Sequence, residues 1–185
     1  KKAFGDVMMR KEMAYQGERY GIGPANTTTL KDFMDTFKDE DESVADVVVD
    51  TIDHPLAKIA QWVPATFKNK KYDNEIKTLD AENAPTTVII NKKGSSSNHR
   101  ASGMGKMHAI VYGQVDVNML PPRFAKTTRG KLTDEHDKNR QLRCSLLSGD
   151  ILILPEMWSF DYTSNRNGVA LERAVSVPPR SERMK

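Results

Sequence analysis

Hydrophobic residues recur with a helical period near the start of the chain and alternate with polar residues further on. In TTTLKDFMDTFK, four apolar residues follow the i, i+3, i+4, i+7 spacing of one helical face: Leu30, Phe33, Met34 and Phe37. Thr28 and Thr29 are candidate N-cap residues, and Asp32 places an acid in the first turn. The spacing predicts a helix over residues 28–38.

Two further segments before residue 65 also carry helical features. In residues 44–52, VADVVVDTI, the apolar residues would share a helical stripe, although the same valines also suit a strand. Both interpretations stay open for this segment. Residues 55–63, PLAKIAQWV, begin with a proline at the first helical position and are followed by Pro64, which favours a short helix. We therefore expect residues 1–64 to be mainly helical.

The period changes to two in MHAIVYGQVDVNM, which predicts one long half-buried strand over residues 107–119. Its apolar face would carry Ala109, Val111, Val115, Val117 and Met119 toward the core. Its polar face would carry His108, Tyr112, Gln114, Asp116 and Asn118. Shorter strands are predicted at NEIKTL, TTVIIN, QLRCSLL, DILILP and GVALERAVSV. Ser148-Gly149-Asp150, between two apolar runs, predicts a hairpin turn.

Helices first and strands later favour an α+β fold over an alternating parallel one. We expect a single domain over residues 1–185, with a mainly helical part (1–64) followed by a mainly antiparallel β-sheet or sandwich (65–185). A chain of 185 residues with 38% hydrophobic residues can bury one core of this kind.

The composition indicates what to expect of membrane association, redox compartment and metal sites. The chain has no apolar run long enough to cross a membrane, so we expect a soluble protein with no membrane partner. Its one cysteine, Cys144, permits no internal disulfide, which suits a reducing compartment. Cys144 is expected to be a small apolar core residue on a strand. The four histidines lack the spacing of a zinc site, so no metal is expected from them.

Charge is unevenly distributed, although the net charge is only +3. Residues 32–53 contain nine acids and one lysine, whereas residues 83–133 contain eight basic residues and one acid. Such runs are either solvated surface or binding faces, and both interpretations stay open. As binding faces, the basic part would meet a polyanion and the acidic part a neighbouring subunit or a basic partner.

The segment NKKGSSSNHRASGMGK, residues 91–106, contains basic, glycine and serine residues and no acid. It lacks the leading glycine and the final serine or threonine of a Walker loop. It is therefore predicted to be a flexible loop, either a simple connection or one that orders on a phosphate backbone. The candidate nucleic-acid-binding residues here are Lys92, Lys93, Arg100 and Lys106. The following PPRFAKTTRGK adds Arg123, Phe124, Lys126, Arg129 and Lys131, in which the phenylalanine would stack on a base.

These features favour a non-enzymatic function: a nucleic-acid-associated or assembly-forming structural protein, as in a viral or ribonucleoprotein particle. The chain would bind a polyanion through its basic loops, without a cofactor, and homo-oligomers are expected among its assemblies. One alternative is a protein-interaction module that uses the acidic segment, with the basic loops as solvated surface.

A second alternative is enzymatic. The triplet Glu75-Ile76-Lys77 resembles the E-x-K half of the PD-(D/E)xK nucleases, in which two carboxylates hold a divalent metal and the lysine positions or activates water. The resemblance implies Mg²⁺ and a catalytic set of Glu75, Lys77 and an upstream aspartate. Asp50, Asp53 and Asp73 are the candidates for that aspartate, and Asp53 is taken as the one to test.

The segment GDILILPEMW resembles the Gly-Asp-apolar-Pro turn of cupin-like barrels. The histidine cluster that gives those barrels their metal is missing from this chain, so no cupin function is inferred. The neighbouring Trp158, Phe160 and Tyr162 alternate along one predicted strand. They are expected to pack in the core or in an interface.

Overall fold

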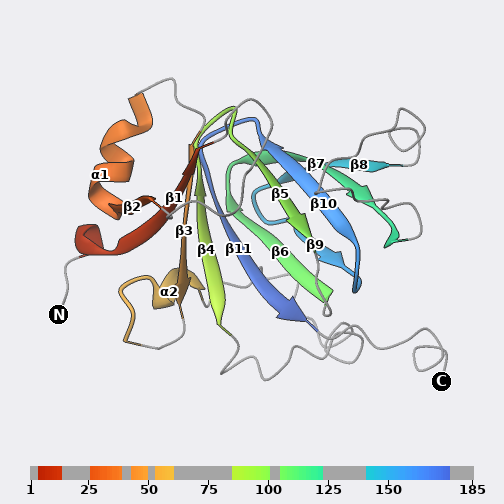
Figure 1. Ribbon diagram of the computed structural model, residues 1–185, viewed down its shortest axis with the longest axis horizontal. Coiled ribbons are helices and arrows are strands. Elements are labelled where there is room, and N and C mark those ends of the chain that lie inside the picture. Colours follow the sequence, from red (N-terminus) through yellow and green to blue (C-terminus); the bar gives the residue numbers. More distant parts are fainter. Residues whose placement is uncertain are drawn as a thin grey trace.

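Strands dominate the computed structural model, which describes residues 4–13, 26–38, 43–49, 53–60, 85–100, 105–122 and 141–175. The strands form two antiparallel sheets that face each other, as Figure 1 shows. A cluster of buried residues from both sheets fills the space between them. The architecture of these residues is therefore a β-sandwich.

The larger sheet has seven strands in the order β2-β1-β3-β4-β11-β6-β9. Their bounds are β1 Met8–Met13, β2 Asn26–Thr29, β3 Ser43–Val49, β4 Thr86–Asn91, β6 Gly105–Tyr112, β9 Ile151–Leu154 and β11 Gly168–Val175. The smaller sheet has four strands in the order β5-β10-β7-β8. These are β5 Ser96–Arg100, β7 Gln114–Leu120, β8 Leu142–Leu147 and β10 Ser159–Ser164.

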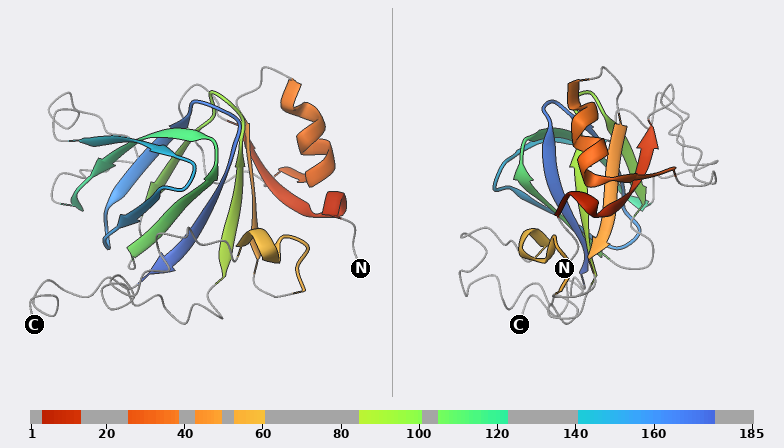
Figure 2. Two further views of the ribbon diagram at one scale, coloured as in Figure 1. Left: turned by 180° about the vertical axis from the view of Figure 1, so that it is seen from behind. Right: turned by 90° about the vertical axis from the view of Figure 1, so that its left-hand side faces the viewer.

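Two short helices cover the face of the larger sheet that points away from the smaller one. They are α1 (Leu30–Asp35) and α2 (Ala57–Ala60), and single 3-10 turns occur at Phe4–Asp6 and Thr36–Lys38. Leu30 and Phe33 of α1 pack with Met9 of β1, and Figure 2 shows α1 against the part of the sheet that contains β1 and β3. This second cluster buries the outer face of the sheet, so the core has two layers.

The expected helical N-terminal part is wrong. The described residues before position 61 form three strands of the larger sheet together with α1 and α2. The ambiguous valine segment is strand β3, because its β-branched side chains suit a sheet that is covered on both faces. The fold of the described residues is consequently mainly β rather than α+β.

The two predicted short helices are confirmed in part. Helical residues extend from Leu30 to Lys38, with a 3-10 turn at the end, and the hydroxyl of Thr29 accepts a hydrogen bond from the Asp32 amide at 3.0 Å. Thr29 is therefore the N-cap, as one of the two predicted candidates, and both Thr28 and Thr29 belong to β2. Helix α2 occupies residues 57–60 of the second segment, where His54 Nδ1 accepts from the Leu56 amide.

The single long strand predicted for residues 107–119 is also wrong. The segment forms β6 and β7, which belong to different sheets and meet at Gly113. Gly113 has φ +104°, and a Cβ there would lie 2.9 Å from Gly168 Cα. Only glycine fits this corner, so the chain turns from one sheet into the other at this residue.

The corner changes which side chains reach which layer. Val115 and Val117 are buried between the sheets, whereas Val111 packs against the cluster under the helices. The three valines thus face apolar clusters, but on opposite sides of the larger sheet. His108, which was assigned to the polar face, is buried between the sheets.

The predicted turn at Ser148-Gly149-Asp150 is present, with Gly149 at φ +99°. It is not a hairpin, because β8 pairs with β7 and β9 pairs with β6. Four of the predicted short strands are confirmed as β4, β8, β9 and β11. The fifth, NEIKTL, lies outside the described residues. Within those residues, none of the helices is both long and apolar enough to span a bilayer.

Candidate functional site

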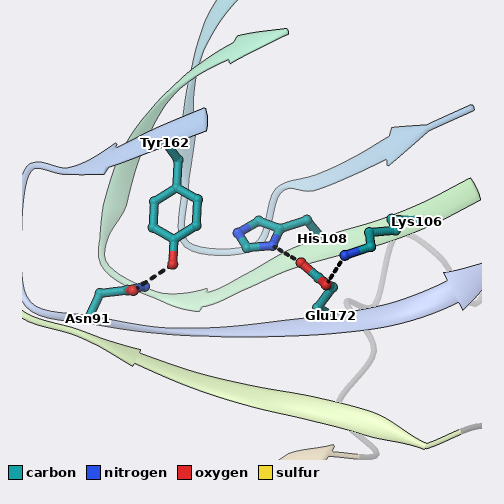
Figure 3. Close-up of polar contacts among 5 residues, drawn as sticks. All are labelled: Asn91, Lys106, His108, Tyr162 and Glu172. Carbon is teal, nitrogen blue, oxygen red and sulfur yellow. Dashed lines mark hydrogen bonds and ion pairs between the residues drawn. The ribbon is translucent and has the colours of Figure 1, made fainter. Parts of the chain in front are cut away.

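A polar cluster lies between the two sheets, and Figure 3 shows its side chains. His108 of β6 is fully buried. Its ring packs against Phe160 and Tyr162 of β10, with centroid distances of 5.6 and 5.4 Å. Since β10 belongs to the smaller sheet, the imidazole joins the two layers of the sandwich.

Glu172 of β11 links this histidine to the surface. It pairs with His108 in the antiparallel register, and its Oε2 lies 3.8 Å from His108 Nδ1. Its other oxygen, Oε1, accepts a hydrogen bond from Lys106 Nζ at 2.5 Å. The exposed fractions of the side chains are 0% for His108, 12% for Glu172 and 24% for Lys106. The cluster therefore runs from the core to the rim of the sandwich.

The rim of this cluster contains a recess of about 180 Å³. Its lining residues are Pro85, Thr87, Gly105, Lys106, Glu172, Arg173 and Ala174. The Arg173 guanidinium donates to the carbonyl oxygen of Ala60, the last residue of α2, on the other face of the sheet. Burial lowers the pKa of Arg173 from its ordinary value. The ionisable side chains of the recess on the inner face are those of Lys106 and Glu172.

A second buried contact fixes the turn between β4 and β5. The Tyr162 hydroxyl donates to Asn91 Oδ1 at 2.9 Å, and both residues are buried. In the turn, the Ser95 hydroxyl donates to the Lys92 carbonyl, and Gly94, at φ 86°, donates its amide to the Ser164 carbonyl. These bonds attach the turn to the end of β10.

Strand β8 is the outermost strand of the smaller sheet in the described part of the chain. Leu142 and Leu147, at its two ends, are 53% and 54% exposed. Between them, Leu146 is buried and Cys144 packs against the core between the sheets. Burial raises the pKa of the Cys144 thiol. The strand thus combines an anchored inner face with exposed apolar ends.

The outer face of the smaller sheet carries two aspartates with opposite pKa shifts. Hydrogen bonds from Asn165 and Ser145 hold the pKa of Asp116 below its usual value. Burial raises the pKa of Asp161, although a hydrogen bond from Asn118 at 2.7 Å and the charge of Arg143 act in the opposite direction. Asp161 is therefore the carboxyl group of this face whose ionisation the fold disfavours.

The basic residues predicted to bind nucleic acid do not form one loop. Lys92 is only 2% exposed, and Lys106 lies on β6 in its ion pair with Glu172. Lys93 is exposed, and Arg100 ends strand β5. The expected flexible loop is corrected here, because residues 96–100 form a strand paired with β10. Arg123, Phe124, Lys126, Arg129 and Lys131 lie outside the described residues.

The structure does not describe all the residues proposed for a nuclease site. Glu75 and Lys77 lie outside the described residues, and Asp53 is exposed in the turn before α2. Among the residues that the structure describes, His, Cys, Asp and Glu side chains form no group of three that could hold a metal ion.

Of the side chains in Figure 3, only Lys106 was predicted as a site residue; His108, Asn91, Glu172 and Tyr162 were not. Glu172 interrupts the apolar run of GVALERAVSV, and a charged residue on a strand that is buried on both faces is a signal for a partner charge. Tyr162 was expected in the core, which is confirmed, but its hydrogen bond to Asn91 was not foreseen.

No family model matches the sequence, and no curated protein matches it. Among solved structures, the chain is similar to Drosophila melanogaster CENP-C bound to CAL1 (TM-score 0.38, 11% identity, covering 54% of this chain and 74% of that one). It is also similar to KdgF from Halomonas sp. (TM-score 0.35, 11% identity, 54% and 73%). A third similar structure is an RmlC-like cupin from Shewanella frigidimarina (TM-score 0.35, 16% identity, 54% and 69%). The description of the fold therefore rests on the two sheets themselves.

Proposed function

We propose that this chain is a non-enzymatic, assembly-forming domain in which strand β8 pairs with β8 of a second copy. The observation that carries this proposal is the exposure of Leu142 and Leu147 on the outermost strand of the smaller sheet. An outermost strand presents backbone donors and acceptors along its outer side, and natural proteins commonly protect it with charges or short length. Here, two large exposed aliphatic side chains lie at the ends of this edge strand, beside one exposed charge, Arg143.

The energetic gain from pairing is modest for each leucine but adds over both chains. Burial of a leucine side chain from full exposure stabilises by roughly 1.5–3 kcal/mol, so covering a half-exposed one contributes about 1 kcal/mol. Two leucines on each of two chains therefore supply several kcal/mol before any backbone hydrogen bond is counted. Association itself costs about 4–15 kcal/mol, so the backbone hydrogen bonds between the paired strands would have to supply the remainder.

A second copy fits this edge because β8 is complementary to itself. In an antiparallel pair of identical strands, the Leu142 end of one strand lies beside the Leu147 end of the other, although the two leucines leave opposite faces of the sheet and so do not contact each other. Such a contact is isologous and closes after two copies. The two smaller sheets would then continue into one another across the interface.

The test is the association state of the purified protein by sedimentation velocity over a range of concentrations. We expect the parent to form dimers and the Leu142→Lys/Leu147→Lys variant to stay monomeric, because edge lysines oppose strand pairing. Met34→Lys is the matched control, since Met34 is an exposed apolar residue on α1. Equal association of the parent and the double variant would refute the assignment to β8, and a parent that stays monomeric would refute self-assembly.

A further inference from the structure

Strands β8 and β9 follow each other along one continuous edge of the sandwich. Their partners β7 and β6 meet at Gly113, and β8 and β9 pair with them in antiparallel register on either side of the turn at residues 148–150 (Figure 1). Ile110 joins the two segments at the bend, because its amide donates to the Asp150 carbonyl and its carbonyl accepts from the Gly149 amide. The β8 edge of the smaller sheet and the β9 edge of the larger sheet therefore lie on the same side of the sandwich.

Strand β9 is the outermost strand of the larger sheet on this side, within the described residues. Its sequence, ILIL, contains no charge, and three of its residues are half-buried whereas Leu154 is buried. Natural edge strands are commonly protected by charges, proline or short length. This strand is short, but the nearest charged and proline residues, Asp150, Pro155 and Glu156, lie outside it. In the described part of the chain, β9 thus presents an aliphatic edge.

Pairing of β8 with a second copy would bring the two β9 strands toward each other. The two-fold axis of an antiparallel strand pair is perpendicular to the sheet, so each face of the sheet stays on its own side. The larger sheets of the two copies then lie in one layer, about 10 Å from the joined smaller sheets. Because β9 lies on the same side of the sandwich as β8, each β9 faces the β9 of the other copy across this axis.

We propose that a second copy pairs with this chain through both strands, β8 with β8 and β9 with β9, so that the interface is two layers deep. This contact rests on the proposed assembly through β8 and extends it to the larger sheet. One pair of edge strands offers a narrow contact, whereas stable interfaces bury about 1,200–2,000 Å² in total. The aliphatic side chains and backbone groups of β9 enlarge the contact and help to offset the cost of association.

The symmetry also restricts which residues of β9 meet. Residues that lie opposite each other leave the same face, so within β9 Ile153 can meet only Ile151 or Ile153 of the second copy. Leu152 and Leu154 pack in the core between the sheets, and Ile151 packs against the cluster under the helices. Ile153 belongs to neither cluster. It is therefore the residue of β9 whose replacement disturbs the fold least.

The experiment measures the dissociation constant of the dimer by sedimentation velocity for the parent and for Ile153→Lys. We expect the variant to dimerise at least about tenfold more weakly, because its two lysines lie close together across the axis. Val48→Lys is the matched control, since Val48 is 55% exposed on β3, inside the larger sheet, and its change should leave the constant unaltered. Urea unfolding of both variants checks that the fold is kept.

Hydrogen–deuterium exchange of the parent tests the same contact without a substitution, so it decides the question if Ile153→Lys fails to fold. Protection of residues 151–154 should rise with protein concentration together with that of residues 142–147. The β9 contact is refuted, while assembly through β8 stands, if only residues 142–147 gain protection or if the folded Ile153→Lys variant dimerises as tightly as the parent. A parent that stays monomeric refutes both.

Discussion

Glu172 lies directly opposite His108 in the register of β11 and β6, and the same carboxylate binds Lys106. Lys106 and His108 are two residues apart on β6, so both side chains leave the same face of the sheet. One carboxylate can therefore contact both. This arrangement lets a strand that is buried on both faces carry a charge, because the charge has a partner at the rim of the sandwich.

The coupling between Lys106 and Glu172 is measurable by a double-mutant cycle on the free energy of unfolding. We expect Glu172→Leu alone to destabilise by about 2–3 kcal/mol, because it leaves a partly buried ammonium without its counter-charge. Adding Lys106→Met should cost less than the sum of the single changes, with a coupling of about 1–2 kcal/mol. Strictly additive effects would show that the ion pair contributes nothing to stability.

Gly113 should tolerate substitution less well than Gly149, although both have positive φ. Alanine at either position costs about 1–2 kcal/mol of conformational strain. At Gly113 the new Cβ would also lie 2.9 Å from Gly168 Cα, whereas at Gly149 it meets nothing within 4 Å. Urea unfolding should give Gly113→Ala an additional loss of about 1–2 kcal/mol. Equal losses for the two variants would contradict the close approach of β6 and β11 at this corner.

The sequence predicted individual elements better than their arrangement. Alternation and β-branched residues located β4, β8, β9 and β11, and the i, i+3, i+4 spacing located α1. Strands β1 and β2 were not predicted, and β3 was left open between helix and strand, because a strand covered on both faces lacks the alternation that marks a strand. The corner at Gly113 was missed because alternation continues through it, although the chain changes sheets.

The candidate site was harder to predict from the sequence, because it depends on pairing between residues that lie far apart in the chain. Lys106 was interpreted as one of four basic loop residues, whereas its partner Glu172 lies 66 residues away. Lys92 was placed on the surface, yet it is buried beside the turn that Ser95 closes. A local charge run contains no information on strand register. It therefore cannot distinguish a solvated lysine from one that is paired across a sheet.

Asp161 should make stability depend on pH. Burial raises its pKa in the folded state, so the folded protein binds the proton more readily than the unfolded chain. Stability is accordingly highest below the unfolded pKa and falls as pH rises through the folded pKa of this group. Asp161→Asn should remove this loss and raise the urea midpoint relative to the parent above that window, with no gain below it. An identical pH dependence of parent and variant would contradict this assignment.

Nucleic-acid binding stays a prediction that rests on the basic residues of the sequence. If the chain binds duplex DNA, neutralising Arg123, Lys126, Arg129 and Lys131 together should reduce the salt dependence of affinity by about three to four units of slope. The exposed Lys58 of α2 serves as the control, because Lys58→Ala should change the slope by no more than about one unit. If the quadruple variant has the same affinity and the same salt slope as the parent, these four side chains do not contact the DNA.

Hydrogen–deuterium exchange of the peptide that contains residues 142–147, measured at several protein concentrations, tests pairing through β8 most directly. Amides that gain a partner strand exchange more slowly, so protection of this peptide should rise with concentration and be lost in Leu142→Lys/Leu147→Lys. Strand β4 lies inside the larger sheet and supplies the internal reference, because its exchange should not change. Exchange of residues 142–147 that is the same at every concentration, in a protein that does associate, would contradict assembly through this edge.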